Sequence, residues 1–454
     1  MSRIRIVKGK IIERVEKDYN IYSESNIIYN SAEVVSENGA TGGVSYGNPS
    51  KPPAGNIRAK CIVKFRPHNK YKDNPEFGFD WLREGDSGQQ GDNWFGSVMG
   101  KYFETDNITV FKNGNSWNTN FKRNLNMYDK KLKSYKNLSI IWKKINGVPY
   151  LYPIPVLTLL KGKSALLNVK IEIKDKPKKL IFEFKDKEAE KYLSLNIKEI
   201  EDIKIGKYDK LNYLKITCKE QFTKEQLLYV KADGEICGTL LIHPNSSTHI
   251  KNISTIFVSV KTDINGIIKV GKPKPGSQLY FRQCLNQALV NPTILDNFSI
   301  DCTGNFIFNT FRNRFCTKIG SKYYINKSSG LKEYLEDEFE NKYGKKYASY
   351  YKVFFIEDIY PSWKNGSISG YTNGFSYFNT TFTVQFNTHS KETVAHELMH
   401  ALGLPHTFDG NPPAKFTYMA YKTNNLMDYC HHVGIQRITV FKWQWKVLNS
   451  KIIL

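Results

Sequence analysis

The sequence lacks the long apolar run that a membrane-spanning helix requires. No stretch of about 18 consecutive apolar residues occurs, so we expect no membrane span. The opening residues, MSRIRIVKGKIIERVEKDY, also lack the apolar core and the small-residue cleavage site of a secretory signal peptide. We therefore expect synthesis in the cytoplasm, with any export using a route that reads no N-terminal signal.

Cysteine is scarce and poorly placed for a disulfide framework. The seven cysteines are odd in number and widely spaced, and none forms a CxxC pair. Disulfide-stapled domains carry an even set at short spacings, so the pattern indicates a protein made and stored in a reducing compartment. The cysteines are Cys61, Cys218, Cys237, Cys284, Cys302, Cys316 and Cys430.

No internal repeat or low-complexity tract is present, and acidic residues are fewer than basic ones. Hydrophobic residues make up 40% of the 454 and charged residues 24%, which excludes a disordered or fibrous chain. The net charge of +23 raises nucleic acid as a partner. However, lysines alternate with acids, as in KDKPKKLIFEFKDKEAEK, which is typical of solvated strand faces, so nucleic acid is not the expected partner.

The length predicts about three domains. Residues 1–148 hold a short alternating stretch from Arg3 to Ile11, a Gly/Pro-rich loop from Gly39 to Gly55, and the strand-like AKCIVKFRP, which together predict a β-rich domain. Residues 149–270 repeat alternating segments such as SALLNVKIEI, EQLLYVKA and STIFVSVKT between charged turns. This spacing is typical of an antiparallel sandwich of immunoglobulin-like size.

A linker precedes the last predicted domain, at residues 277–454. Gly271 to Gly276, with the sequence GKPKPG, can continue neither strand nor helix. After it, SQLYFRQCLNQALV and GLKEYLEDEFENKYG have helical spacing, whereas KVFFIEDIY and FTVQFN resemble buried strands. The alternation predicts an α/β or α+β domain. The fold class expected for the chain is therefore multi-domain, mostly β at first and α+β at the end.

Only nine histidines occur, and three of them share one short segment, SKETVAHELMHALGLPHTFDG. Ser390 is a plausible helix N-cap. His396 and His400 are four residues apart, so they lie on one helical face, and Glu397 points near the same side. Gly403 allows a sharp turn that would return His406 toward the other two imidazoles. Four other histidines, His68, His243, His249 and His389, have no such spacing and are expected at the surface or in turns.

Three neutral imidazoles with one open position are what a catalytic zinc ion requires. The open position holds water, whose pKa falls toward about 7 on zinc. Glu397 would accept the proton of this water and later pass it to the leaving amine. The predicted cofactor is therefore Zn²⁺, with His396, His400 and His406 as ligands and Glu397 as general base.

The segment HELMHALGLPH fits HExxHxxGxxH and so resembles the metzincin zinc peptidases. The family has a methionine turn beneath the metal. Met419 and Met427 are the candidates, and Met427 in NNLMDY resembles the pappalysin-like branch. The resemblance implies a metzincin-type catalytic domain at 277–454, with FTVQFN as a sheet edge that binds extended peptide. It also implies that RITVFKWQWKVLNS forms a terminal helix.

Residues after the candidate turn have less certain roles. The resemblance implies that Tyr429 stabilises the tetrahedral intermediate, and a packed core tyrosine is the equal alternative. Cys430, His431 and His432 are too close together to surround one ion, so a role in lining the substrate cleft is the better hypothesis for the two histidines.

The front half carries a second resemblance. SRIRIVKGK, YNIYSESNIIYNSA and FGFDWLR are similar to the opening of polymorphic effector proteins of Bacteroidetes that leave the cell by type VI secretion. This implies a delivery and targeting region at the front, a toxin domain at the end, release into target cells by a contractile system, and secretion-apparatus proteins and an immunity protein as partners.

The sequence thus predicts a zinc-dependent endopeptidase that acts on protein or peptide and serves as the toxin domain of a secreted antibacterial effector. Two other classes stay open. One is a binding or adhesion protein with a non-catalytic zinc site, and the other is a basic nucleic-acid-binding protein, which would bind DNA with a steep salt dependence.

Overall fold

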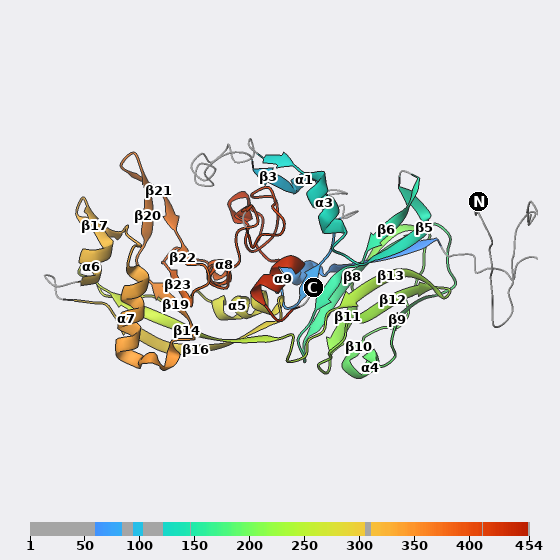
Figure 1. Ribbon diagram of the computed structural model, residues 1–454, viewed down its shortest axis with the longest axis horizontal. Helices are drawn as coiled ribbons and strands as arrows, with labels where there is room; N and C mark the ends of the chain where they lie inside the picture. The colour runs from blue at the N-terminus through green and yellow to red at the C-terminus, as the bar shows by residue number, and fades with distance from the viewer. Residues whose placement is uncertain are drawn as a thin grey trace, which may run out of the picture. The chain divides into compact units, whose positions relative to one another are not determined.

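The computed structural model describes most of the chain beyond residue 59, and this part forms one compact unit, Lys60–Leu454. The alternating stretch at Arg3–Ile11 and the predicted loop at Gly39–Gly55 lie outside the described residues. The structure describes residues 60–83, 94–102, 121–145, 147–304, 310–410 and 412–452. The fold is mostly β, with several sheets in its N-terminal region (Figure 1).

Two sheets dominate the N-terminal region. The first has the order β1-β8-β11-β10, and the second has the order β2-β7-β13-β12-β9. All neighbouring strands are antiparallel except β13 and β7. The strands of the first sheet are β1 (Cys61–Pro67), β8 (Ser164–Ile173), β11 (Gly206–Cys218) and β10 (Leu193–Leu195). Those of the second are β2 (Gly78–Asp80), β7 (Val156–Thr158), β13 (Glu235–Ile242), β12 (Gln226–Ala232) and β9 (Leu180–Phe184).

The alternation in the sequence buries one face of each strand, and the two sheets meet through these faces. The rings of Phe65 on β1 and Phe182 on β9 lie 6.3 Å apart. At Gly238 on β13 the sheets approach so closely that a Cβ would stand 2.4 Å from the carbonyl oxygen of Val63. Since β1 and β2 belong to the region predicted as 1–148, strands from that region complete the sheets predicted for 149–270.

A mixed sheet organises the C-terminal part of the chain. Strand β14 (Lys251–Thr262) pairs in parallel with β16 (Val290–Asp301) on one side and β19 (Tyr351–Ile356) on the other. Beyond β19 come β23 (Phe382–Gln385), which is parallel, and β22 (Gly374–Ser376), which is antiparallel and lies at the edge. The short β15 (Lys269–Val270) pairs with the end of β14.

Two predictions about these strands are wrong. The segment STIFVSVKT forms β14 of the mixed sheet and not a strand of the N-terminal sheets, so this sheet begins before the GKPKPG segment. Its residues are buried on both faces, as in parallel strands generally, and alternation alone could not show this. FTVQFN forms β23, which β22 covers, so it is not the edge.

Helices cover both faces of the mixed sheet. Phe257 and Phe355 join one core with α5 (Ser277–Asn286) and α8 (Lys391–Ala401), and this core continues into the N-terminal region. Val258 and Phe354 point the other way, into a core with α6 (Thr310–Phe315) and α7 (Leu331–Tyr343). The predicted helices around residues 277–290 and 330–344 are confirmed as α5 and α7, and the predicted terminal helix forms as the short α9 (Lys442–Leu448).

Smaller elements connect these layers. The helical ones are η1 (Asn69–Lys72), α1 (Trp94–Val98), α3 (Leu125–Leu132), α4 (Ala189–Tyr192), η2 (Lys345–Tyr347) and η3 (Cys430–Val433). The strands form four hairpin-like pairs: β3 (Gly100–Tyr102) with β4 (Phe121–Arg123), β5 (Asn137–Ile145) with β6 (Val148–Pro153), β17 (Cys316–Ile319) with β18 (Lys322–Ile325), and β20 (Tyr360–Lys364) with β21 (Ser367–Thr372). None of the helices in the described ranges is long and apolar enough to cross a lipid bilayer.

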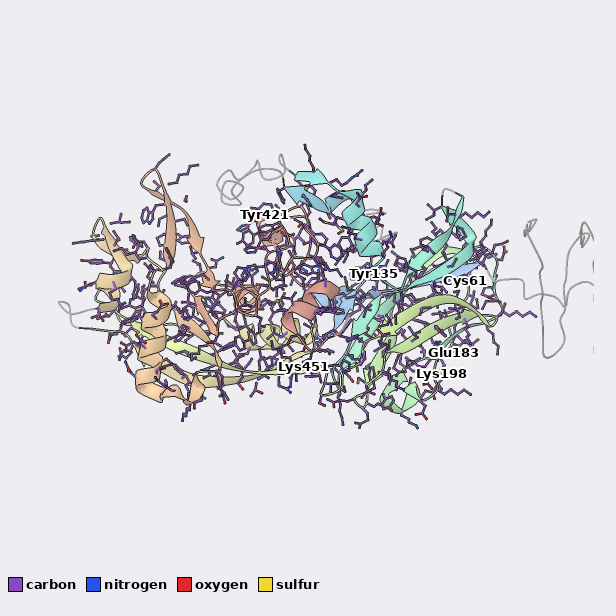
Figure 2. All side chains as sticks on the ribbon, viewed as in Figure 1. Cys61, Tyr135, Glu183, Lys198, Tyr421 and Lys451 are labelled. Carbon is purple, nitrogen blue, oxygen red and sulfur yellow. The ribbon has the colours of Figure 1, made fainter. Side chains whose placement is uncertain are left out.

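A buried carboxylate joins the N-terminal region to the C-terminal helix. Asp80 Oδ2 accepts hydrogen bonds from the hydroxyl of Tyr135, which is labelled in Figure 2, at 2.8 Å and from the backbone N–H of Lys442 at 3.0 Å. The ammonium of Lys131 lies 3.8 Å from the same oxygen, and burial lowers its pKa to about 8. Because Lys442 begins α9, these contacts fix the N-terminal region against the part of the chain that holds the histidines.

Two of the histidines predicted for the surface or for turns are buried. His389 lies among the residues that follow β23, and His243 follows β13 with only 2% of its surface exposed. Neither ring nitrogen of His243 has a hydrogen-bond partner in the described part of the chain. Burial lowers the pKa of His243 to about 4, because the charged imidazolium is poorly solvated there.

His243 should therefore make the fold acid-sensitive. In the unfolded chain its pKa is near 6.5, so between pH 6.5 and 4 the unfolded state binds the proton and the folded state does not. We expect the free energy of unfolding to fall by about 2–3 kcal/mol more from pH 7 to 4.5 in the wild type than in His243→Phe. Urea unfolding at both pH values measures this difference, and equal pH dependence of the two proteins would contradict it.

Candidate metal centre

Helix α8 begins directly after Ser390, as the sequence predicts. The Ser390 hydroxyl accepts a hydrogen bond from the Thr393 N–H at 3.3 Å, and the Thr393 hydroxyl accepts one from the Ser390 N–H at 3.2 Å. This reciprocal cap satisfies two helix-end donors and confirms Ser390 as the N-cap. One face of the helix then presents His396 and His400 one turn apart.

A glycine bend ends the helix and returns the chain. Gly403 has φ +90°, and its N–H donates to the carbonyl of His400 at 2.8 Å. A Cβ at this position would stand 2.5 Å from Oδ1 of Asn379, so both the backbone angle and the lack of space favour glycine. The bend carries His406 back beside the helix, as the spacing predicted.

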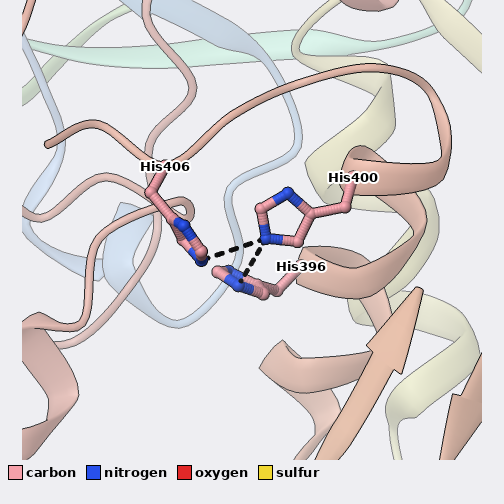
Figure 3. A group of neighbouring side chains, drawn as sticks. All are labelled: His396, His400 and His406. Atoms are coloured by element: carbon pink, nitrogen blue, oxygen red, sulfur yellow. Dashed lines mark hydrogen bonds between the residues drawn. The ribbon is translucent and has the colours of Figure 1, made fainter. Parts of the chain in front are cut away.

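The three imidazoles converge on one point (Figure 3). Nε2 of His400 lies 3.1 Å from Nε2 of His396 and 3.1 Å from Nε2 of His406. All three candidate ligand atoms lie within 4.8 Å of one another. Among the described residues, these three histidines form a group that could hold a metal ion.

The opposite nitrogen of each ring faces a protein oxygen. Nδ1 of His396 lies 2.9 Å from the carbonyl oxygen of Leu426, and Nδ1 of His400 lies 2.7 Å from that of Leu404. Nδ1 of His406 lies 3.3 Å from a carboxylate oxygen of Asp409, which also accepts the His406 backbone N–H at 3.0 Å. Because carbonyls only accept hydrogen bonds, Nδ1 carries the proton in His396 and in His400.

This protonation leaves unshared electron pairs on Nε2. Burial lowers the pKa of His396 and His400 well below the usual value, so both rings are neutral. Two neutral Nε2 atoms cannot hydrogen-bond to each other when neither carries a proton, and their lone pairs repel at 3.1 Å. A cation held by the three nitrogens removes this repulsion, so the donor set fits a metal that accepts imidazole ligands.

Glu397 lies next to the first histidine and is buried, with 8% of its surface exposed. The hydroxyl of Ser376, on the edge strand β22, lies 3.5 Å from Glu397 Oε2. Burial raises the pKa of Glu397 to about 7, and the charge of Arg437 opposes this effect. A carboxyl group with a pKa near neutrality can both take up and release a proton at neutral pH.

The segment around Met427 supports two of the three rings. The carbonyl of Leu426 contacts His396, and the carbonyl of Met427 accepts the N–H of Thr407, the residue after His406, at 3.1 Å. Asp428 ties this segment together by accepting three backbone N–H groups and the Thr423 hydroxyl. Met427 is fully buried in the core beside α8, whereas Met419 is only partly buried.

Tyr429 lies beside the histidines. Its ring centre is 4.8 Å from that of His406 and 6.0 Å from that of His396. Burial raises the pKa of Tyr429, so its hydroxyl is protonated at neutral pH and can donate a hydrogen bond. Cys430 is buried outside the three-histidine group, and His431 and His432 are exposed near Tyr429.

Four residues at the site were not predicted. Asp409 follows His406 by three positions, and this spacing of a carboxylate after a ligand histidine was a usable signal. Ser376 and Arg437 lie 21 residues before and 40 residues after Glu397 in the sequence, so no local pattern connects them with it. Phe378, half exposed, places its ring centre 5.2 Å from that of His400 and adds an apolar surface.

Searches of family models and of curated proteins found no match to this chain.

Proposed function

We propose that this chain is a zinc-dependent endopeptidase with its active site at His396, His400, His406 and Glu397. The observation that supports it most is the convergence of three Nε2 atoms whose Nδ1 partners are all protein oxygens. Nitrogen ligands on one tetrahedral zinc ion are about 3.3 Å apart, close to the 3.1 Å between neighbouring Nε2 atoms. Imidazoles also suit copper, iron and nickel. We favour zinc because a general base beside three imidazoles fits hydrolysis by a metal-activated water.

The protein residues divide the work of hydrolysis. A bound Zn²⁺ supplies the Lewis acid that activates water and polarises the scissile carbonyl. Glu397 accepts a proton from the attacking water and returns it to the leaving amine. Tyr429 donates its hydroxyl proton as a hydrogen bond to the oxygen that becomes negative. The edge strand β22 offers unpaired backbone groups to an extended peptide near Glu397.

The proposal extends to the domain types and to the delivery of the protein. We assign the mixed sheet with α5, α8 and the Met427 segment to a metzincin-type domain, and the two facing N-terminal sheets to an immunoglobulin-like sandwich. The role as a toxin delivered by type VI secretion rests on segments before residue 60, outside the described residues, and on FGFDWLR, which contains β2.

The test is metal analysis together with proteolysis by the full-length protein. We expect about one equivalent of zinc per chain and cleavage of an unfolded protein such as casein. A chelator should stop the cleavage, and added zinc should restore it. Absence of bound zinc would overturn the proposal. Stoichiometric zinc without turnover would favour the non-catalytic binding protein, and steeply salt-dependent DNA binding would favour the nucleic-acid alternative.

A further inference from the structure

Arg437 is a buried arginine whose backbone is fixed by contacts with neighbouring segments. It follows η3 and has 4% of its surface exposed. The hydroxyl of Tyr280 on α5 donates to its carbonyl oxygen, and the next residue, Ile438, donates its N–H to Asn424 at 2.9 Å. Contacts on both sides fix the backbone from which the side chain extends.

The guanidinium of Arg437 has no acidic partner in the described part of the chain. No ion pair or hydrogen bond of this side chain is present there, and its Nε is enclosed without a partner. Two other buried charges differ, since Lys131 approaches Asp80 and Asp358 pairs with Lys269 at 2.6 Å. Burying a charge without a counter-charge is costly, so the position favours an anion from outside the chain.

The charge of Arg437 acts on the reacting groups. It lowers the pKa of Glu397 and of His396, and it also acts on Tyr429. Backbone contacts also place the segment of Arg437 next to the metal group. Thr439, two residues after Arg437, accepts the N–H of Leu426 at 2.8 Å. The carbonyl oxygen of Leu426 in turn lies 2.9 Å from Nδ1 of His396. Glu397 forms no ion pair with Arg437 in the described part of the chain, and its proposed task requires it to exchange protons.

We propose that Arg437 binds a carboxylate of the substrate next to the scissile bond, so that the enzyme prefers acidic peptides. This inference rests on the proposed peptidase function. Arginine presents a planar set of donors that matches a carboxylate with two parallel hydrogen bonds. The carboxylate can come from an aspartate or glutamate side chain or from the free C-terminus of a peptide, and the two sources are separable by experiment.

The test compares quenched fluorescent peptides that differ at one position. Asp, Glu, Asn, Gln or Lys is placed in turn on each side of the cleaved bond, and a further pair ends in a free acid or an amide. We expect kcat/KM for the acidic peptide to exceed that of its amide counterpart about ten- to hundredfold. In Arg437→Gln this ratio should approach one, and Arg437→Lys should retain part of it.

Controls separate this role from others. Arg282→Gln removes a positive charge from the exposed face of α5 and should keep the wild-type ratio. If Arg437 only adjusts Glu397, the variant changes the rates of acidic and neutral peptides equally, and the proposal is overturned. A wild type without acidic preference overturns it as well.

A binding experiment makes the result independent of turnover. Full-length Glu397→Gln is titrated with the same acidic and neutral peptides, and the Kd ratio is compared with that of Glu397→Gln/Arg437→Gln. Tighter binding of the acid that disappears with Arg437 supports the carboxylate site even if the wild type cleaves nothing, in which case only the peptidase function fails. Equal binding of both peptides overturns the carboxylate site.

Discussion

Glu397→Gln should lower the rate of peptide hydrolysis by about 10²–10⁴-fold, the usual contribution of a general acid–base residue. The amide keeps the shape of the side chain but cannot accept the proton of the attacking water. Since Glu397 is not among the three converging ligands, zinc content should be unchanged. Steady-state kinetics on one peptide, with zinc measured on the same sample, gives both results.

The fold of this variant should also be intact. Burial raises the pKa of Glu397 to about 7, which means that the ionised carboxylate is less stable in the fold than in water. Between the ordinary value of 4.5 and about 7 the folded state binds the extra proton, so at pH 8 the ionised group destabilises the fold. A neutral glutamine at this position should not lower the free energy of unfolding at pH 8.

Glu392→Gln is the matched control. It makes the same chemical change in the first turn of the same helix, away from the imidazole group. We expect it to retain hydrolysis within a few-fold of the wild type, because first-turn carboxylates contribute about 0.3–1 kcal/mol to helix stability only. Wild-type turnover by a zinc-loaded Glu397→Gln protein would show that another residue is the base.

The sequence could predict the metal group because its parts are local. His396 and His400 are related by one helical turn, and Gly403 reverses the chain within six residues of His400. The N-cap at Ser390 and the positive φ that glycine tolerates fix where the helix starts and where the chain turns. Neither depends on distant residues. The strands AKCIVKFRP and KVFFIEDIY could be predicted because their residue patterns are local as well.

Strand partners could not be predicted, since they depend on distant residues. The segment of β14 alternates like its predecessors, but its parallel neighbours β16 and β19 begin about 40 and 100 residues after its own start. Three residues, Gly374–Ser376, are too few to predict a strand, yet they form the edge β22 and bring Ser376 to Glu397. The position of Arg437 depends on contacts with residues elsewhere in the sequence, namely Tyr280 on α5 and, through Ile438, Asn424.

Gly403→Ala should separate the third ligand from the other two. At φ +90° an alanine costs about 1–3 kcal/mol, and its Cβ would overlap Oδ1 of Asn379 at 2.5 Å. The Asn379 side chain can turn away from the new methyl group, but the backbone strain is relieved only if the bend opens, which moves His406 away from His400. We expect zinc affinity to fall roughly 10–100-fold, as when the support of a ligand is lost. Competition with a chromophoric chelator measures the affinity.

Gly410→Ala and His406→Ala show which step fails. Gly410 lies in the same returning segment at a negative φ, and a Cβ there would meet nothing closer than 3.9 Å, so that variant should bind zinc normally. His406→Ala removes the ligand without backbone strain, so it should lose zinc while its metal-free form unfolds near the wild-type urea concentration. Gly403→Ala should show both losses, because strain in the bend lowers the stability of the metal-free protein too. Wild-type zinc affinity in Gly403→Ala would mean that the bend does not position His406.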